Sequence, residues 1–214
     1  MTSTAPKMPV FPVRNVILDA AEKRFLYYGY NKTTMAEIAA DVEMSAANIY
    51  RYFQNKQELA VCCCERRMGE RLSALEKIVQ QRGLRTRDKL SHYVLTLIKD
   101  SHTLASKDSR AGELVDNITA ERPDLLRTHN SVHYTLISQI VQEGIQNKEL
   151  KPIDAEQYAP AIHSSFALFE NPMFVGLYTE SELKDRALKL VELLLEGLLL
   201  NRFITLEKDT SQKC

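Results

Sequence analysis

Three helix starts follow one another within residues 33–58, and this segment constrains the fold more than any other. Thr34 and Glu37 have the spacing of a capping box, in which each side chain binds a backbone amide of the other residue. Ser45 and Asn55 are favourable N-cap residues at the two later starts. The segment therefore predicts two short helices joined by a tight turn, followed by the beginning of a third.

The second of these helices extends only from Ser45 to about Phe53, or roughly two turns. Ile49 and Tyr50 mark its expected buried side. A helix this short is marginal in isolation, so a scaffold must hold it and present its N-terminal end. A helix-turn-helix, which places its second helix in the DNA major groove, uses such an arrangement.

Residues 14–60 resemble the DNA-binding domain of the TetR/AcrR family of bacterial repressors. The residues that carry the resemblance are Ile17, Leu18, Ala20, Ala21, Phe25, Gly29, Tyr30, Thr33, Thr34, Ile38, Ala39, Ser45, Ile49, Tyr50, Tyr52, Phe53, Asn55, Lys56 and Leu59. The resemblance implies an all-α fold. An N-terminal three-helix DNA-binding head with a helix-turn-helix would be linked by a long helix to a larger helical ligand-binding and dimerisation domain.

The resemblance also implies a function and a set of DNA contacts. The chain would be a transcriptional regulator, a repressor that binds a palindromic double-stranded operator as a homodimer and is released by a small-molecule effector. The implied DNA-binding residues are Thr33, Thr34, Ser45, Ala46, Ala47, Asn48, Tyr50, Arg51, Tyr52 and Lys56. Backbone amides at the first helical turns attract phosphates, and a lysine adds a mobile point charge. Arg51 stays open between a phosphate contact and a solvated side chain.

The segment departs from the family pattern at two positions. Glu43 stands where the turn usually contains glycine, and Ala47 stands where the recognition helix often has glycine. A glutamate in a left-handed turn is less stable than glycine by about 1 kcal/mol. The tip of the recognition helix also lacks arginine and glutamine, so direct base readout is expected to be sparse. Specificity would then depend on Tyr50, the spacing within the dimer and DNA shape.

The charge balance excludes a strong uniform attraction to DNA. The chain carries 28 basic and 28 acidic residues, for a formal net charge of zero. Residues 1–56 are only weakly basic, with seven basic and five acidic side chains. DNA binding is therefore expected to rest on local phosphate contacts and helix N-termini.

Composition and helical periodicity divide the chain into four parts. These are a disordered arm over 1–12, a helix-turn-helix domain over 13–60, a helical ligand-binding and dimerisation domain over 61–206, and a flexible tail over 207–214. The expected helices run from Arg14 to Gly29, through the motif, and then over 56–81, 87–105, 109–119, 123–147, 154–170 and 179–203. No secretory signal or membrane span is predicted, because the most apolar run, 190–200, is short and contains two glutamates. We expect a cytoplasmic protein.

The last helix is apolar on more than one side, whereas a surface helix needs one apolar stripe. Its apolar residues are Leu183, Ala187, Leu190, Val191, Leu194, Leu195, Leu198 and Leu199. One side can pack on its own domain, and the other needs a partner. We therefore expect a homodimer formed through the last two helices.

The resemblance implies a small-molecule site among the middle helices. The candidate lining residues are Tyr93, Ile118, His129, His133, Phe166 and Phe169. Each of them also fits an ordinary core position, and that interpretation stays open for each. The aromatic content favours an apolar or aromatic ligand over a sugar. A ligand would act by changing the distance between the two recognition helices, which matches DNA at about 34–36 Å.

The sequence offers four less favoured alternatives. His129 and His133 share one helical face at a spacing that can hold zinc, but a third ligand would have to come from Glu121 or His163 through folding, so neither a metal nor a cofactor is predicted. The run of cysteines at 62–64 is either a redox sensor or small apolar filling in the connecting helix. An interaction protein without sequence-specific DNA binding is less favoured, and an enzyme is not expected because no catalytic motif is found.

Overall fold

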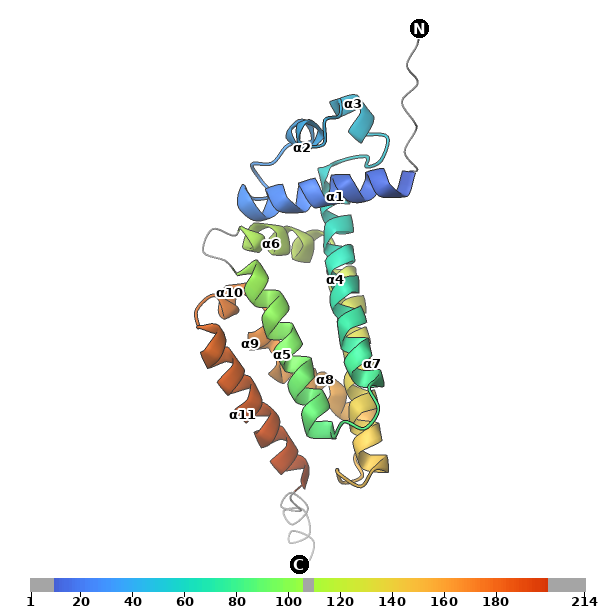
Figure 1. Cartoon of the computed structure of the whole chain (residues 1–214), viewed down its shortest axis with the longest axis vertical. Coiled ribbons are helices and arrows are strands. Elements are labelled where there is room, and N and C mark those ends of the chain that lie inside the picture. The colour runs from blue at the N-terminus through green and yellow to red at the C-terminus, as the bar shows by residue number, and fades with distance from the viewer. Residues whose placement is uncertain (1–9, 106–109, 200–214) are drawn as a thin grey trace, which may run out of the picture.

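The computed structural model describes residues 10–105 and 110–199, and every regular element among them is a helix (Figure 1). The helices are α1 (Val10–Tyr27), α2 (Met35–Asp41), α3 (Ala46–Ile49), α4 (Lys56–Gln80), α5 (Thr86–Leu104), α6 (Ala111–Glu121), α7 (Pro123–Gln146), α8 (Ala155–Ser165), α9 (Ala167–Glu170), α10 (Pro172–Val175) and α11 (Glu180–Leu199). The predicted all-α fold is confirmed. No described helix is both long and apolar enough to cross a membrane.

The head consists of α1, α2, α3 and the first turns of α4, which enclose a core of their own. Its buried side chains are Val13, Ile17, Leu18, Ala21, Phe25, Tyr30, Met35, Ile38, Ala39, Ile49, Phe53, Leu59, Ala60, Val61 and Cys63. Leu114 and Ile118 of α6 complete this core. The head core therefore depends on a helix from the middle of the chain, which lies under α1 in Figure 1.

The body encloses a second and larger core. Helix α4 runs from the head along the length of the body, with α7 behind it and α5 beside it, and α11 packs on the other side of α5 (Figure 1). The buried side chains of this core come from α4, α5, α7, α8, α9 and α11 and from the short links, and Tyr93, Leu97, Ile140, Phe166 and Val191 are among them. Helix α11 contributes the stripe Leu183, Ala187, Val191 and Leu195, which recurs every four residues.

Most predicted helix boundaries are confirmed within one or two residues. Helix α7 begins at Pro123, as expected for a proline in the first helical position. The Gln157 amide donates to Asp154 Oδ1 at 3.0 Å, and Thr179 forms the expected reciprocal cap with Glu182. The predicted arm over residues 1–9, the predicted helix end at 203 and the tail over 207–214 lie outside the described residues.

Three boundary predictions were wrong. The helix expected to extend from Ser45 to about Phe53 spans only Ala46–Ile49. Residues 10–12 were assigned to the arm but form the first turn of α1, where a proline such as Pro12 is tolerated. The helix expected to run from Asp154 to residue 170 ends at Ser165. The hydroxyl of Ser165 donates to the Ile162 carbonyl oxygen at 2.6 Å, and such local bonds compete with the helical ones. Phe166 then turns into the core before α9 begins.

Candidate nucleic-acid interface and effector site

Helix α2 is held at both ends by hydrogen bonds. At its start, Thr34 Oγ1 accepts from the Glu37 amide at 3.3 Å, and Glu37 Oε2 accepts from the Thr34 amide at 2.8 Å. The bonds from Thr34 lower the pKa of the Glu37 carboxyl. At its end, the amides of Met44 and Glu43 donate to the carbonyl oxygens of Ala39 and the following residue, at 2.8 and 3.1 Å. This is the Schellman arrangement, and it directs the chain into α3.

Glu43 adopts a left-handed conformation, with φ at 54°. It occupies the position after the helix end where glycine is the usual residue. The predicted left-handed glutamate in the turn is therefore confirmed. Its side chain is exposed, so a carboxylate lies on the surface between the two helices of the motif.

Helix α3 is a single turn that is capped by Ser45, whose Oγ accepts from the Asn48 amide at 3.2 Å. Ile49 is fully buried and anchors the helix to the head core. Tyr50, expected on the buried side, is instead 51% exposed. Because one turn presents only one residue directly to the core, Ile49 fills that place and Tyr50 points outward. Ala46 and Ala47 are exposed as well.

Two predicted DNA-contacting residues are engaged inside the head. Thr33 is buried, and its hydroxyl donates to the Gly29 carbonyl oxygen at 2.8 Å. Lys56 Nζ donates to the carbonyl oxygens of Tyr30 and Thr33 at 2.8 and 3.0 Å, and it lies 4.4 Å from the centre of the Tyr30 ring. Burial lowers the pKa of Lys56. Both side chains thus hold the loop before α2 in place.

The remaining predicted DNA-contacting residues are at least partly accessible. Thr34 and Arg51 are exposed, and Asn48 and Tyr52 are half-buried. The Tyr52 carbonyl oxygen accepts a hydrogen bond from Arg14 Nη1 at 2.7 Å.

Sequence reasoning missed two arginines that hold the motif on α1. Arg14 binds the Tyr52 carbonyl oxygen, and its guanidinium lies 4.1 Å from the centre of the Phe53 ring. Arg24 Nη2 donates to Asp41 Oδ1 at 2.9 Å, which links α1 to the end of α2. Both arginines lie one or two positions from apolar stripe residues, but their partners are 17 and 38 residues away in sequence. Only the tertiary fold brings these pairs together.

Within the body, three predicted pocket residues meet around Tyr93 on α5. The Tyr93 hydroxyl and Nδ1 of His133 are 2.5 Å apart, and the Phe166 ring centre lies 6.2 Å from that of Tyr93. Burial raises the pKa of Tyr93. Phe169 is buried in the same core. These side chains form an aromatic centre in which polar atoms are buried beside apolar rings.

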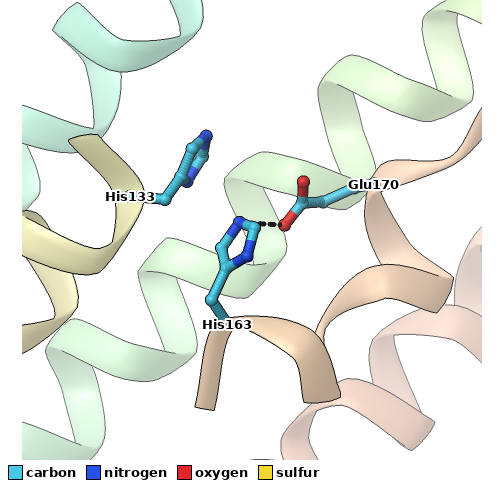
Figure 2. A group of neighbouring side chains, drawn as sticks. All are labelled: His133, His163 and Glu170. Carbon is cyan, nitrogen blue, oxygen red and sulfur yellow. Dashed lines mark ion pairs between the residues drawn. The ribbon is translucent and has the colours of Figure 1, made fainter. Parts of the chain in front are cut away.

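Histidines from two helices extend this centre. Nε2 of His133 lies 3.1 Å from Nε2 of His129, one turn away on α7. Burial lowers the pKa of His129 to about 4, and burial together with the charge of His129 lowers that of His133 to about 2. His163 of α8 joins them, with its ring centre 4.7 Å from that of His133, and Figure 2 shows it facing Glu170. The sequence left open whether His163 or Glu121 would supply a third ligand-type side chain. The fold brings His163 next to the two histidines of α7.

Ile118 does not belong to this centre. It is buried in the head core together with Leu114 and Phe25. The sequence pattern assigned Ile118 to a buried face of its helix correctly. It could not indicate which of the two cores that face contacts.

The three consecutive cysteines differ in exposure but share one electrostatic trend. Cys63 is buried, whereas Cys62 and Cys64 are partly exposed. Burial raises the pKa of all three thiols, and that of Cys64 reaches about 12. A thiol in this state holds little of the thiolate that reacts with oxidants, so the arrangement favours the apolar-filling interpretation.

A chain of ion pairs joins the head to the body. Glu22 of α1 lies between Arg66 and Arg67 of α4, at 2.8 and 2.5 Å. Arg67 also reaches Asp100 of α5 at 3.4 Å, and Asp100 binds Arg71 at 2.6 Å. All of these side chains are at least partly buried. The connecting helix therefore carries a ladder of charges that contacts the head at one end and the body at the other.

Comparison with known proteins agrees with this architecture. The fatty acid metabolism regulator protein of Bacillus subtilis is 24% identical over 138 residues, which cover 63% of this chain and 69% of that protein. The fatty acid degradation regulator FadR from Bacillus halodurans has a similar structure, with a TM-score of 0.63 at 19% identity over 92% of this chain and 98% of that one. SmeT, the repressor of the Stenotrophomonas maltophilia multidrug efflux pump SmeDEF, has a TM-score of 0.64 at 19% identity, covering 88% and 91%.

Family comparison covers both parts of the chain. Residues 17–61 match the family of bacterial regulatory proteins described as the tetR family. Residues 86–191 match the tetracyclin repressor-like C-terminal domain. The matched segments correspond to the head with the helix-turn-helix and to most of the body. The chain therefore belongs to the tetR family and is a DNA-binding transcriptional regulator.

Proposed function

We propose that this regulator is a repressor that binds a palindromic operator as a homodimer and leaves it when a small apolar or aromatic molecule binds in the body. The observation that supports the proposal most is the surface of α3. Ile49 anchors the helix in the core, while Ala46, Ala47 and Tyr50 point away from it. A helix buried only at one residue has its other side chains available for a partner.

On this surface, each side chain suits a different part of DNA. The methyl groups of Ala46 and Ala47 fit thymine methyls in the major groove, and the Tyr50 hydroxyl can bind a base edge or a phosphate. Arg51 suits a phosphate because it is exposed. Thr33 and Lys56 act through the loop that they hold, since their polar atoms are already bonded within the head.

For the dimer, α11 offers apolar surface beyond the stripe that it buries. Leu188 and Leu193 lie outside the buried stripe and are exposed, the latter by 65%. Tyr158 of α8 is also exposed. We infer a twofold interface that involves α8 and α11, because closed twofold dimers are the commonest oligomers and both helices carry exposed apolar side chains.

The effector site is inferred at the aromatic centre of Tyr93, Phe166 and Phe169. Its rings favour an apolar or aromatic molecule, and the buried histidines offer polar anchors for a head group. The relative from Bacillus subtilis is named a regulator of fatty acid metabolism. A fatty acid is therefore the first effector to test.

The test is selection of bound sequences from a random pool of duplex DNA, followed by anisotropy titration of the selected site. An inverted repeat supports both the dimer and the helix-turn-helix contacts. Tyr50→Ala is expected to weaken binding about tenfold or more, because one specific contact is worth about 1–3 kcal/mol. Tyr27→Ala, which removes a 62% exposed tyrosine from α1, is the matched control and should bind as the unchanged protein does.

Three results would each contradict a part of the proposal. Equal binding to all sequences in a salt titration would favour the alternative of an interaction protein without sequence-specific recognition. A selected site without symmetry would argue against the dimer. In the same titration, a fatty acid that releases the operator supports repression by an apolar effector, and tighter binding in its presence would contradict release.

A further inference from the structure

Three ligand-type side chains from three helices meet inside the body. They are His133 of α7, His163 of α8 and Glu170 of α9, and Figure 2 shows them gathered around one space. One donor atom from each lies within 4.8 Å of the others. The two histidines are buried and the glutamate is half-buried. The cluster is thus shielded from bulk water, unlike a group of acidic side chains on a surface.

The bonding within the cluster is incomplete. Nε2 of His163 and Oε1 of Glu170 are 2.9 Å apart, the ion-pair contact drawn in Figure 2, but the geometry is not that of a hydrogen bond and neither atom has a hydrogen-bond partner. Nδ1 of the neighbouring His129 also lacks one. Buried polar atoms are nearly always bonded, so three such atoms in one place require an explanation.

We propose that His133, His163 and Glu170 bind one divalent transition-metal ion of the zinc type. A cation accepts lone pairs from all three donors at once, which a hydrogen-bond donor on the protein cannot do. Two imidazoles and one carboxylate are a common donor set for zinc, whereas magnesium and calcium prefer oxygen donors. The proposal concerns a site apart from the DNA contacts and does not depend on the proposed function.

The spacing of the donors fits an ion after a small adjustment. Zinc binds nitrogen and oxygen at about 2.0–2.2 Å, so the donors of a tetrahedral ion lie about 3.3 Å apart. The separation between His163 and Glu170 is already 2.9 Å. No two donor atoms of the cluster lie more than 4.8 Å apart, so the longest separation exceeds the tetrahedral value by at most about 1.5 Å. Metal binding would therefore require side-chain rotations that bring the three donors closer together.

The surroundings hold the donors in place. The Tyr93 hydroxyl contacts Nδ1 of His133 at 2.5 Å, and the Ser101 hydroxyl donates to the Glu170 carbonyl oxygen at 2.7 Å. Partners of this kind orient metal ligands and raise their affinity. Three protein ligands leave a fourth position for water or for a donor atom of a bound molecule. His129 supplies the nearest further nitrogen, 3.1 Å from Nε2 of His133.

The test uses the full chain without an affinity tag, stripped with EDTA and then dialysed against zinc chloride. Elemental analysis is expected to find one zinc per chain. Glu170→Gln and His163→Gln should each lower the affinity for zinc at least about tenfold in a chelator competition. His92→Gln is the matched control, because it removes an exposed histidine from α5 and should leave zinc binding unchanged.

A second measurement keeps the test decisive if a variant fails to fold. Cobalt(II) added to the unchanged, stripped protein should give the intense visible absorption of a four-coordinate site, and zinc should abolish it. A spectrum like that of cobalt in water, or no retained zinc in the unchanged protein, would overturn the proposal. So would equal zinc affinity in the folded Glu170→Gln and His163→Gln variants. None of these measurements involves DNA, so their outcome is independent of operator binding.

Discussion

Replacing Glu43 by glycine should stabilise this protein, although it removes a whole side chain. The residue sits in the turn between α2 and α3 at φ 54°, and its amide donates to the Ala40 carbonyl oxygen at 3.1 Å. For a residue with a Cβ, this left-handed conformation is unfavourable by about 1–2 kcal/mol. Glycine adopts it without that penalty.

The expected net gain in the free energy of unfolding is smaller than the backbone strain that the substitution removes. Glycine gives the unfolded chain more conformational freedom, which offsets part of the benefit by about 0.5–1 kcal/mol. We expect Glu43→Gly to raise the free energy of unfolding by about 0.5–1 kcal/mol. For a chain of 150–250 residues, 1 kcal/mol shifts Tm by about 2–4 °C, so the expected increase is about 1–4 °C.

Thermal unfolding followed by circular dichroism at one fixed protein concentration measures this shift, because the Tm of a dimer depends on concentration. Glu43→Ala is the matched control, since it removes the carboxylate but keeps a Cβ in the left-handed turn. Its Tm should stay within about 1 °C of the unchanged protein or fall. If alanine raised Tm as much as glycine, the charge and not the backbone would be responsible, and the reasoning would be refuted.

Three further predictions concern stability and reactivity. Burial lowers the pKa of His129 to about 4 and that of His133 to about 2, while an unfolded histidine titrates near 6.5. Between about pH 6.5 and pH 4 the unfolded chain therefore binds more protons than the folded one, so the free energy of unfolding of EDTA-treated protein should fall as the pH drops through this range. A free energy of unfolding that stays constant with pH in urea titrations would contradict the burial of neutral rings. Gly29→Ala should lower the free energy of unfolding, measured by urea titration, by about 1–3 kcal/mol, because φ is 92° and the new Cβ would lie 2.5–2.8 Å from the Glu113 carboxylate. Adding Glu113→Ala should restore only part of this loss, and a complete restoration would mean that the backbone is not strained. Burial raises the pKa of Cys64 to about 12, so mass spectrometry should show slow reaction of this thiol with iodoacetamide near neutral pH in the folded protein and fast reaction in urea. Rapid labelling of the folded protein would instead favour the redox-sensor interpretation.

The head could be predicted from the sequence in detail because its signals are local. A capping box at Thr34, an N-cap at Ser45 and a glutamate in place of glycine at residue 43 each act within about four residues, and each is found as expected. The orientation of Tyr50 was the exception. Helical periodicity assumes at least two turns, but α3 has four residues, so the neighbour of Ile49 lies outside the core.

The body was harder to predict because its signals are repetitive. Helical stripes indicate that a face is buried but not what it contacts, so Ile118 was grouped with Tyr93 although the two lie in different cores. The same limit hid Glu170. Its partner His163 is seven residues away across a helix break that the sequence pattern did not predict, and only the fold turns the two side chains toward each other.

Helical stripes also do not indicate how the body can influence the head, because this influence depends on contacts between residues that are far apart in sequence. Helix α6 completes the head core with Ile118, and the Arg110 amide before it donates to the Leu26 carbonyl oxygen of α1 at 2.7 Å. On the other side, Glu22 of α1 is tied to Arg67 of α4 and so to the body. The head is thus held at two points that lie on helices packed against the body. A shift of α4 relative to α6 must strain one of these attachments or rotate α1, and a molecule bound in the body changes DNA affinity only to the extent that it favours one of those arrangements over the other.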